Sequence, residues 1–142
     1  MVPQTAPLVA AVVVLFSLGY FMMASLPFLL VRLDIKEVWR LFRGLFNVYF
    51  RVVGIAALLA SMAFALSGHV LAALAMITLG VWASALRKPL LEQLDLRQAA
   101  LQSGEAGAVR VLRVIHCGTM LANVAIVAAL VSSLPVLVSG TP

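Results

Sequence analysis

One segment near the C-terminal end joins the last charged residues of the chain to a long apolar run. It reads Arg110-Val-Leu-Arg113-Val-Ile-His116-Cys117-Gly-Thr119-Met120-Leu-Ala-Asn123, and the apolar run ends near Pro135. The segment holds the only cysteine of the chain and one of its two histidines. Polar groups are costly at the entrance of a membrane span. The pattern therefore predicts a membrane helix whose first turns have a function.

The composition of the whole chain agrees with this prediction. Of its 142 residues, 64% are hydrophobic and 11% are charged, and the mean hydropathy is +1.14. An ordinary soluble domain is about a quarter charged. Four long apolar runs predict an all-α, four-helix transmembrane bundle in a single membrane domain, residues 1–142. We expect spans near residues 7–31, 45–66, 70–86 and 114–135, with cytoplasmic loops near 32–44 and 87–113.

Both charged loops show helical periodicity. In the first loop, Asp34 and Glu37 have the spacing of a capping box, which would start a helix. Apolar residues then recur on one side of that helix, at Ile35, Val38, Trp39, Phe42 and Phe46. In the second loop, leucines at helical spacing follow Pro89. We therefore expect a short amphipathic helix in each loop, lying at the membrane surface.

Small or restricted residues predict local features of the spans. Pro27 predicts a kink near the inner end of the first span. The sequence Ser67-Gly68-His69 predicts a tight turn between the second and third spans. Gly80 and Ser84 are four residues apart, a spacing of small residues that lets another helix approach closely.

The charges predict how the bundle is oriented. All ten Lys and Arg residues and all five Asp and Glu residues lie between Arg32 and Arg113, at span ends that face one side. By the positive-inside rule, both charged loops are cytoplasmic and both termini are outside. We expect an integral protein of a bacterial inner membrane. A cleaved signal peptide is the competing interpretation of residues 7–31, but no Lys or Arg precedes this run.

The net charge of +5 does not indicate nucleic acid binding. The sequence pI is about 10.4, which in a soluble protein would point to such a partner. Here the basic residues flank apolar spans, so topology and anionic lipid explain them better.

A polar stripe marks the start of the fourth span. Arg113, His116, Met120 and Asn123 are three or four residues apart, so they share one helical face. One interpretation is a polar site at the inner leaflet for an anionic headgroup, a cofactor or a partner. The alternative is that His116 and Asn123 hydrogen-bond to neighbouring helices.

Two residues of the second span could complete this site. Asn47 and Arg51 are four residues apart and share a face within the first turns of that span. Arg51 either snorkels back to the inner surface or points into the bundle toward a carboxylate or a bound anion. The predicted inner-leaflet site thus contains Asn47, Arg51, Arg113, His116, Met120 and Asn123.

Haem is one candidate cofactor. Two histidines in a four-helix membrane protein are typical of haem ligation. However, His69 lies at the outer turn and His116 near the inner surface, so about 20–30 Å of bilayer should separate them. A haem b with His116 as its single axial ligand remains open.

Copper is the other candidate. His116, Cys117 and Met120 are ligand types that copper accepts. Met22, Met23 and Met76 lie at middle depths of other spans and could complete a thioether-rich site. The alternative role of methionine is to fill irregular gaps between helices.

Motifs of catalysis are absent from the sequence. It contains no Gly-rich phosphate loop, no H-E-x-x-H and no serine-nucleophile motif. We therefore predict a non-enzymatic accessory subunit in the lipid bilayer, bound to other membrane protein subunits or to a second copy. The alternative is a haem or copper carrier centred on His116.

Several short motifs also carry a family resemblance. In chain order they are Gly19 and Pro27, Leu45-Phe46-x-x-Tyr49-Phe50, Lys88-Pro89, and Arg110-x-x-Arg113-x-x-His116-x-x-Thr119-x-x-x-Asn123. Through them the chain resembles the transmembrane protein 205-like family (domain of unknown function 4149), whose members usually carry serine where Thr119 stands. The resemblance implies a four-helix membrane bundle. It extends distantly to haem- or copper-handling four-helix membrane proteins, including the copper resistance D type.

Overall fold

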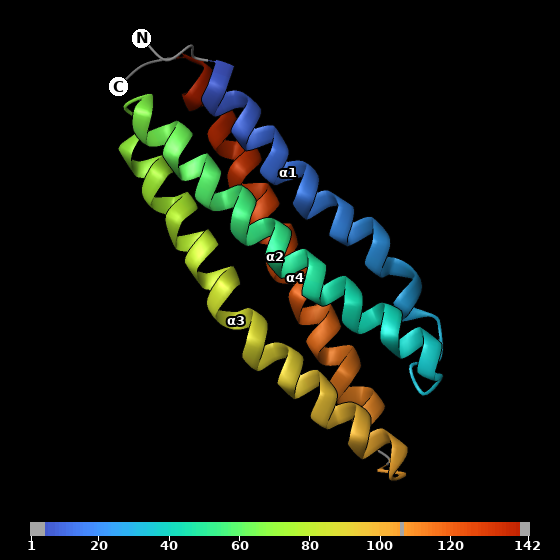
Figure 1. Cartoon of the computed structure of the whole chain (residues 1–142). Coiled ribbons are helices and arrows are strands. Elements are labelled where there is room, and N and C mark those ends of the chain that lie inside the picture. Colours follow the sequence, from blue (N-terminus) through green and yellow to red (C-terminus); the bar gives the residue numbers. More distant parts are fainter. Residues whose placement is uncertain (1–4, 106, 140–142) are drawn as a thin grey trace.

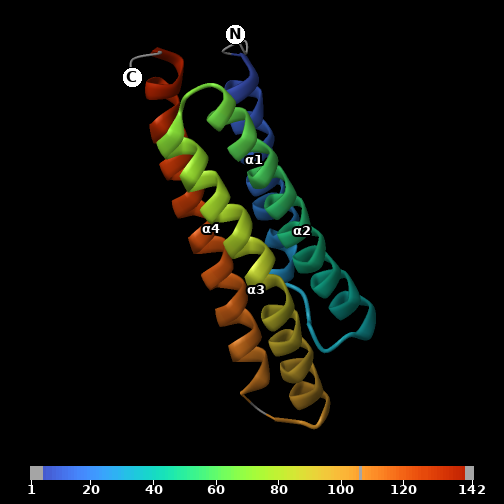
Figure 2. The same cartoon turned by 60° about the vertical axis from the view of Figure 1, so that its left-hand side comes forward.

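Four long α-helices form the chain, which is described by a computed structural model over residues 5–105 and 107–139. They are α1 (Thr5–Ser25), α2 (Lys36–Leu66), α3 (Val70–Gln102) and α4 (Ala108–Ser139), with a 3-10 helix η1 (Leu26–Leu29) after α1 (Figures 1 and 2). Each long helix is apolar enough to cross a membrane. The prediction of an all-α bundle of four such helices is confirmed.

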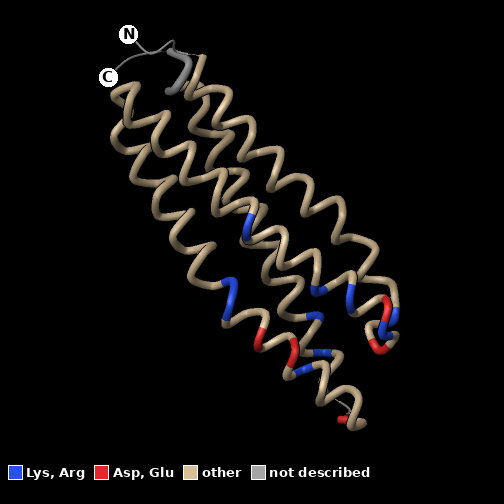
Figure 3. The backbone as a smooth tube through the Cα atoms, in the orientation of Figure 1, with Lys and Arg blue, Asp and Glu red and all other residues tan. Residues whose placement is uncertain are grey.

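The helices alternate in direction along one common axis. The start of α1, the α2–α3 turn and the end of α4 lie at one end of the bundle (Figure 1). The α1–α2 and α3–α4 connections lie at the other end, which carries the charged residues (Figure 3). One end of the bundle is therefore apolar and the other is charged.

The first α-helix ends before Pro27. Proline has no backbone N–H, so Pro27 cannot donate to the carbonyl four residues earlier. Its own carbonyl accepts hydrogen bonds from the backbone N–H groups of Leu30 (3.1 Å) and Val31 (3.2 Å). The kink predicted at Pro27 is instead a change from α-helix to 3-10 helix.

The amphipathic segment after Asp34 is the beginning of α2 and not a separate helix. The residue that caps α2 is Ile35, without a side-chain capping bond. Asp34 instead accepts hydrogen bonds from Arg32, 2.6 Å from Nη2 and 3.2 Å from Nε, and this guanidinium lowers the pKa of the Asp34 carboxyl. The predicted capping box is wrong because a guanidinium is a stronger, two-pronged donor to a carboxylate than a backbone N–H.

The third helix extends far beyond the predicted span end at residue 86. It continues through Pro89 to Gln102, so the connection to α4 shrinks from the predicted 87–113 to 103–107. Pro89 removes one helical hydrogen bond. The helix nevertheless continues, with Leu91 and Leu94 buried in the core and Asp95 paired with Arg43 of α2 at 2.6 Å. The second amphipathic helix is thus the last part of α3.

Glycines bring α2 and α3 into the closest contact in the bundle. A Cβ atom on Gly80 would lie 2.8 Å from Cγ of Leu58 and 3.2 Å from the carbonyl oxygen of Gly54. A Cβ atom on Gly54 would lie 2.9 Å from Oγ of Ser84. The close helix approach predicted from Gly80 and Ser84 is confirmed, and Gly54 supplies the opposing surface.

Candidate functional site

A buried polar centre connects three helices. Asn123 of α4 is fully buried, and its Oδ1 accepts a hydrogen bond of 2.9 Å from the Tyr49 hydroxyl of α2. Its Nδ2 donates at 2.7 Å to the backbone carbonyl of Leu18 in α1. The ring of Phe21 stacks on Tyr49 at a centroid distance of 4.0 Å and closes this centre from α1. Asn123 therefore bonds helices to one another, as the structural alternative predicts.

His116 is also fully buried, but its surroundings are aromatic. The rings of Phe42 and Phe46 meet it edge to face at centroid distances of 5.3 Å and 6.0 Å. Neither ring nitrogen has a hydrogen-bond partner among the residues that the structure describes. A buried polar atom without a partner loses its hydration without compensation.

Gln98 of α3 shares this property and was not predicted. It is 6% exposed, and both polar atoms of its amide lack partners within the described part of the chain. The sequence contains a signal for it. Gln98 lies four residues after Leu94 and seven after Leu91, so it occupies the apolar stripe of its helix.

The six residues of the predicted inner-leaflet site occupy different places. His116 and Asn123 are buried, and Met120 is half-buried against the core. Arg113 is exposed and donates from Nη1 to the carbonyl of Leu29 at 2.9 Å. The structure therefore brings Arg113 to the end of η1 and leaves His116 inside the bundle.

Asn47 and Arg51 are not joined to the stripe. Oδ1 of Asn47 accepts from Nε and Nη2 of Arg87 at 2.9 Å and 2.7 Å, which links α2 to α3. Arg51 is exposed on the outside of α2. Arg87 is thus the partner that sequence reasoning missed, because nothing in a helical pattern says which residue of a neighbouring helix lies opposite.

The residues proposed for copper do not converge. Cys117 is exposed, whereas its neighbour His116 is buried. Met23 is 73% exposed, and Met76 is buried on α3. Within the described residues, no three His, Cys, Asp or Glu side chains gather as a metal site would require.

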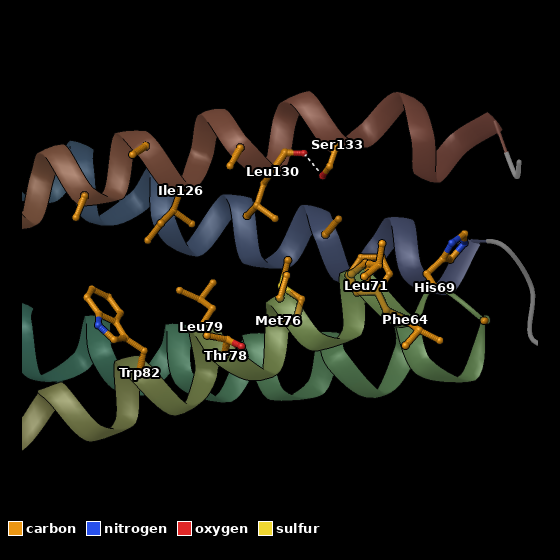
Figure 4. Close-up of a pocket in the computed structure, with 18 residues that line it drawn as sticks. Phe64, His69, Leu71, Met76, Thr78, Leu79, Trp82, Ile126, Leu130 and Ser133 are labelled. Atoms are coloured by element: carbon orange, nitrogen blue, oxygen red, sulfur yellow. Dashed lines mark hydrogen bonds between the residues drawn. The ribbon is translucent and has the colours of Figure 1, made fainter. Parts of the chain in front are cut away.

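A large hollow lies between α3 and α4 near the apolar end. It has a volume of about 1040 Å³, and Met76, Leu79 and Trp82 of α3 face Ile126 and Leu130 of α4 across it (Figure 4). A second hollow of about 310 Å³ continues it toward the charged end and shares Trp82, Ala122 and Ile126. We call the two together the α3/α4 groove.

The groove exists because α3 and α4 contact each other over few residues. The most extensive helix contact is between α2 and α3. The contacts of α4 with α1 and with α3 involve fewer residues. The lining contains no Lys, Arg, Asp or Glu, and His69 lies at its apolar end. The hydroxyls of Thr78 and Ser133 bond backbone carbonyls of their own helices. The α3/α4 groove is thus an apolar surface open to the side of the bundle.

Comparison of the chain with models of protein families, with curated proteins and with solved structures gives no match. The resemblance to the transmembrane protein 205-like family therefore stays a prediction.

Proposed function

We propose that the protein is a small accessory subunit of the membrane that holds one apolar transmembrane helix of a partner protein in its α3/α4 groove. The observation that carries this proposal is the length of the groove. On α3 its lining runs from Val70 to Leu90, about 30 Å at about 1.5 Å per residue. The hydrocarbon core of a bilayer is also about 30 Å thick. The groove therefore matches one membrane-spanning helix.

The residues of α4 that line the groove support a helix as its occupant. Small side chains recur along it at spacings of three and four, at Gly118, Ala122, Ala125, Ala129 and Ser133. Small residues at this spacing let the backbone of a second helix come close, and van der Waals contact then drives association in lipid. A lipid chain is flexible and has no need of such a flat surface.

The lining also defines the chemistry of the partner segment. It contains no charged residue, so a charge on the partner helix at this depth would be left unpaired and costly. The stripe of small side chains on α4 leaves space that large side chains of a partner fill best. We therefore expect an uncharged helix that presents Leu, Ile or Phe at helical spacing.

The proposal includes an orientation. With the charged end of the bundle in the cytoplasm of a bacterium, both termini lie outside the inner membrane (Figure 3). Alkaline phosphatase fused after Pro142 should be active and green fluorescent protein at the same point dark. The same reporters inserted at Gly104 should give the opposite pattern. A fluorescent C-terminal fusion would overturn this orientation.

Photo-crosslinking in native membranes tests the occupant of the groove. A photoreactive amino acid replaces Ala125 or Ala129, which line the groove, or Val124 or Leu121, which are exposed on α4 outside it. We expect one crosslinked protein of distinct mass at both groove positions and none at the control positions. A second substitution, Ala122→Trp, fills the groove and should abolish the crosslink.

Two outcomes would contradict the proposal. A crosslinked product of twice the mass of this chain would show that a second copy occupies the groove. Crosslinks to lipid alone at Ala125 and Ala129, in membranes that contain all native partners, would show that no helix binds there.

The alternative function, a haem or copper carrier centred on His116, has one observation in its favour. Both ring nitrogens of His116 lack partners among the described residues, as those of a ligand would before binding. The enclosing rings of Phe42 and Phe46 and the outward position of Cys117 speak against it. An absorption spectrum and a metal analysis of the purified protein test this alternative. It requires a Soret band or bound copper in the wild type, and the loss of that signal in His116→Phe.

A further inference from the structure

Asn47, Arg51 and Arg87 form a second polar cluster, on the outside of the α2–α3 pair. Arg87 bonds Asn47 through Nε and Nη2, as described above. Arg51 follows Asn47 by four residues, so it lies one helical turn further along the same face of α2. Asn47 and Arg87 are half-buried and Arg51 is exposed. We call these three residues the Arg51/Arg87 cluster. None of them belongs to the buried centre at Asn123 or to the α3/α4 groove.

The Arg51/Arg87 cluster offers hydrogen-bond donors and contains no acidic residue. Oδ1 of Asn47 already accepts from Arg87, so the Nδ2 group of Asn47 remains as a donor. Arg87 keeps its Nη1 group, and the guanidinium of Arg51 makes no hydrogen bond or ion pair within the described residues. The nearby carboxylates are engaged elsewhere, since Asp95 binds Arg43 and Glu92 faces Lys88. The cluster therefore has unused donors and, in the described part of the chain, no free carboxylate nearby to pair with them.

The depth of the cluster indicates which source of anions these donors can reach. About 22 Å of helix separate Arg51 from Leu66 at the apolar end of α2, and about 25 Å separate Arg87 from Val70 on α3. The hydrocarbon core is about 30 Å thick. With the α2–α3 turn at the opposite membrane surface, as in the orientation proposed above, both residues fall just inside the leaflet at the charged end, where a long side chain reaches the phosphate layer.

We propose that Asn47, Arg51 and Arg87 bind the phosphate group of an anionic phospholipid in this leaflet. Guanidinium groups bind phosphate through two parallel hydrogen bonds, and Asn47 holds that of Arg87 in place while adding a donor of its own. The bound phosphodiester carries one negative charge and so offsets part of the positive charge of Arg51 and Arg87, which is costly at this depth. The site is independent of the helix-docking proposal, because it lies on α2 and α3 and not between α3 and α4.

Lipid titration of the full-length protein tests the site. Phosphatidylglycerol is added to delipidated protein in mild detergent, and native mass spectrometry counts the bound lipid, with phosphatidylcholine as the reference lipid. Arg51→Gln and Arg87→Gln should each weaken phosphatidylglycerol binding about fivefold, the effect of one basic residue near an anionic surface. Asn47→Asp places a carboxylate beside Arg87 and should weaken binding more strongly than either.

Arg40→Gln is the matched control, because Arg40 is exposed on α2 nearer to its N-terminal end and its loss changes the net charge equally. It should change binding less than twofold. Arg87→Lys keeps the positive charge and loses the two parallel N–H donors of the guanidinium. Its phosphatidylglycerol binding should lie between that of the wild type and that of Arg87→Gln. Helical circular dichroism and gel filtration confirm that each variant is folded.

Two results would overturn the proposal. One is that the wild type, Arg51→Gln and Asn47→Asp bind phosphatidylglycerol equally, or that Arg40→Gln weakens this binding as much as Arg51→Gln does. The other is displacement of phosphatidylglycerol by millimolar inorganic phosphate, which would assign the cluster to a soluble anion instead of a lipid.

Discussion

Asn123 and His116 lie two helical turns apart on α4 and are both fully buried, yet their polar atoms meet different surroundings. Asn123 bonds the Tyr49 hydroxyl and the Leu18 carbonyl, whereas the His116 ring lies among phenylalanines. A satisfied polar group stabilises the bundle, and an unsatisfied one costs the free energy of its lost hydration. These residues should therefore respond oppositely to apolar substitution.

Asn123→Ala should lower the free energy of unfolding by about 1–3 kcal/mol, because it leaves the Tyr49 hydroxyl buried without its partner and removes the additional hydrogen bond to the Leu18 carbonyl. Tyr49→Phe removes one bond only and should cost about 0.6 kcal/mol, the average for such bonds in membrane helices. Denaturant unfolding in mixed micelles measures both variants and the double variant. If the two effects were simply additive, the hydrogen bond between these side chains would carry no coupling.

Gln98→Met should raise the free energy of unfolding by about 1 kcal/mol. The substitution keeps the length of the side chain and removes two buried polar atoms that have no partner among the described residues. Gln93→Met is the control, since Gln93 is exposed on the same helix and its change should be within about 0.5 kcal/mol. A clear loss of stability in Gln98→Met would indicate that the amide is bonded through water.

At the level of elements, α2 and α3 form the most tightly packed pair and α4 the most loosely packed helix. Gly54 and Gly80 let the backbones of α2 and α3 meet, with side chains of Leu58 and Ser84 filling the remaining space. Lipid tails are as apolar as leucine, so close packing of this kind is the main force between helices in a membrane. The α2–α3 pair is therefore the rigid part of the fold.

Gly80→Ala should destabilise the protein by about 1–3 kcal/mol, as overpacking does elsewhere. Its new methyl group would meet Leu58 and the Gly54 carbonyl, and a backbone atom cannot rotate away. Gly54→Ala should cost less, because it meets the movable hydroxyl of Ser84, and Ser84→Ala should restore the loss. Thermal unfolding in detergent measures the series.

Gly44→Ala is the control for this series. A Cβ atom there meets nothing within 4 Å, and alanine favours the helix over glycine by about 1 kcal/mol. It should therefore stabilise α2. Equal behaviour of Gly44→Ala and Gly80→Ala would contradict the close contact between α2 and α3.

At the scale of the whole molecule, the limited contact between α3 and α4 leaves one side of the bundle open. Trp82 lies in this opening and is 43% exposed, while Trp39 is 8% exposed inside the bundle. In a bilayer without a partner, lipid chains should enter the α3/α4 groove and contact Trp82.

Brominated lipids should therefore quench the fluorescence of Trp82 strongly and that of Trp39 weakly. The variants Trp39→Phe and Trp82→Phe isolate the two signals. In the Trp39→Phe background, Ala122→Leu fills the groove beside Trp82 and should reduce quenching, whereas Val124→Leu lies outside the groove and should not. Equal quenching of both tryptophans would mean that the groove is closed in the bilayer.

The sequence by itself determined the class of the fold, the number of long apolar helices and the placement of every charge at one end. These properties depend on the transfer free energy of each residue and on turn residues such as Gly68, so they can be read from the amino-acid sequence. Helical spacing also placed Arg113, His116, Met120 and Asn123 on one face of α4, although it did not separate the buried His116 and Asn123 from the exposed Arg113. The lengths of the helices were harder to predict from the sequence. The capping-box spacing at Asp34 does not start α2, because Asp34 pairs with Arg32, and Pro89 does not end α3.

Only the tertiary structure decided which side chains meet. The bonds of Asn123 to Tyr49 and Leu18, and the choice of Arg87 as the partner of Asn47, depend on the rotation and depth of one helix against another. The α3/α4 groove depends on how closely α3 and α4 approach each other. A pattern within one helix encodes which face is apolar, but it does not encode the neighbour that this face will contact.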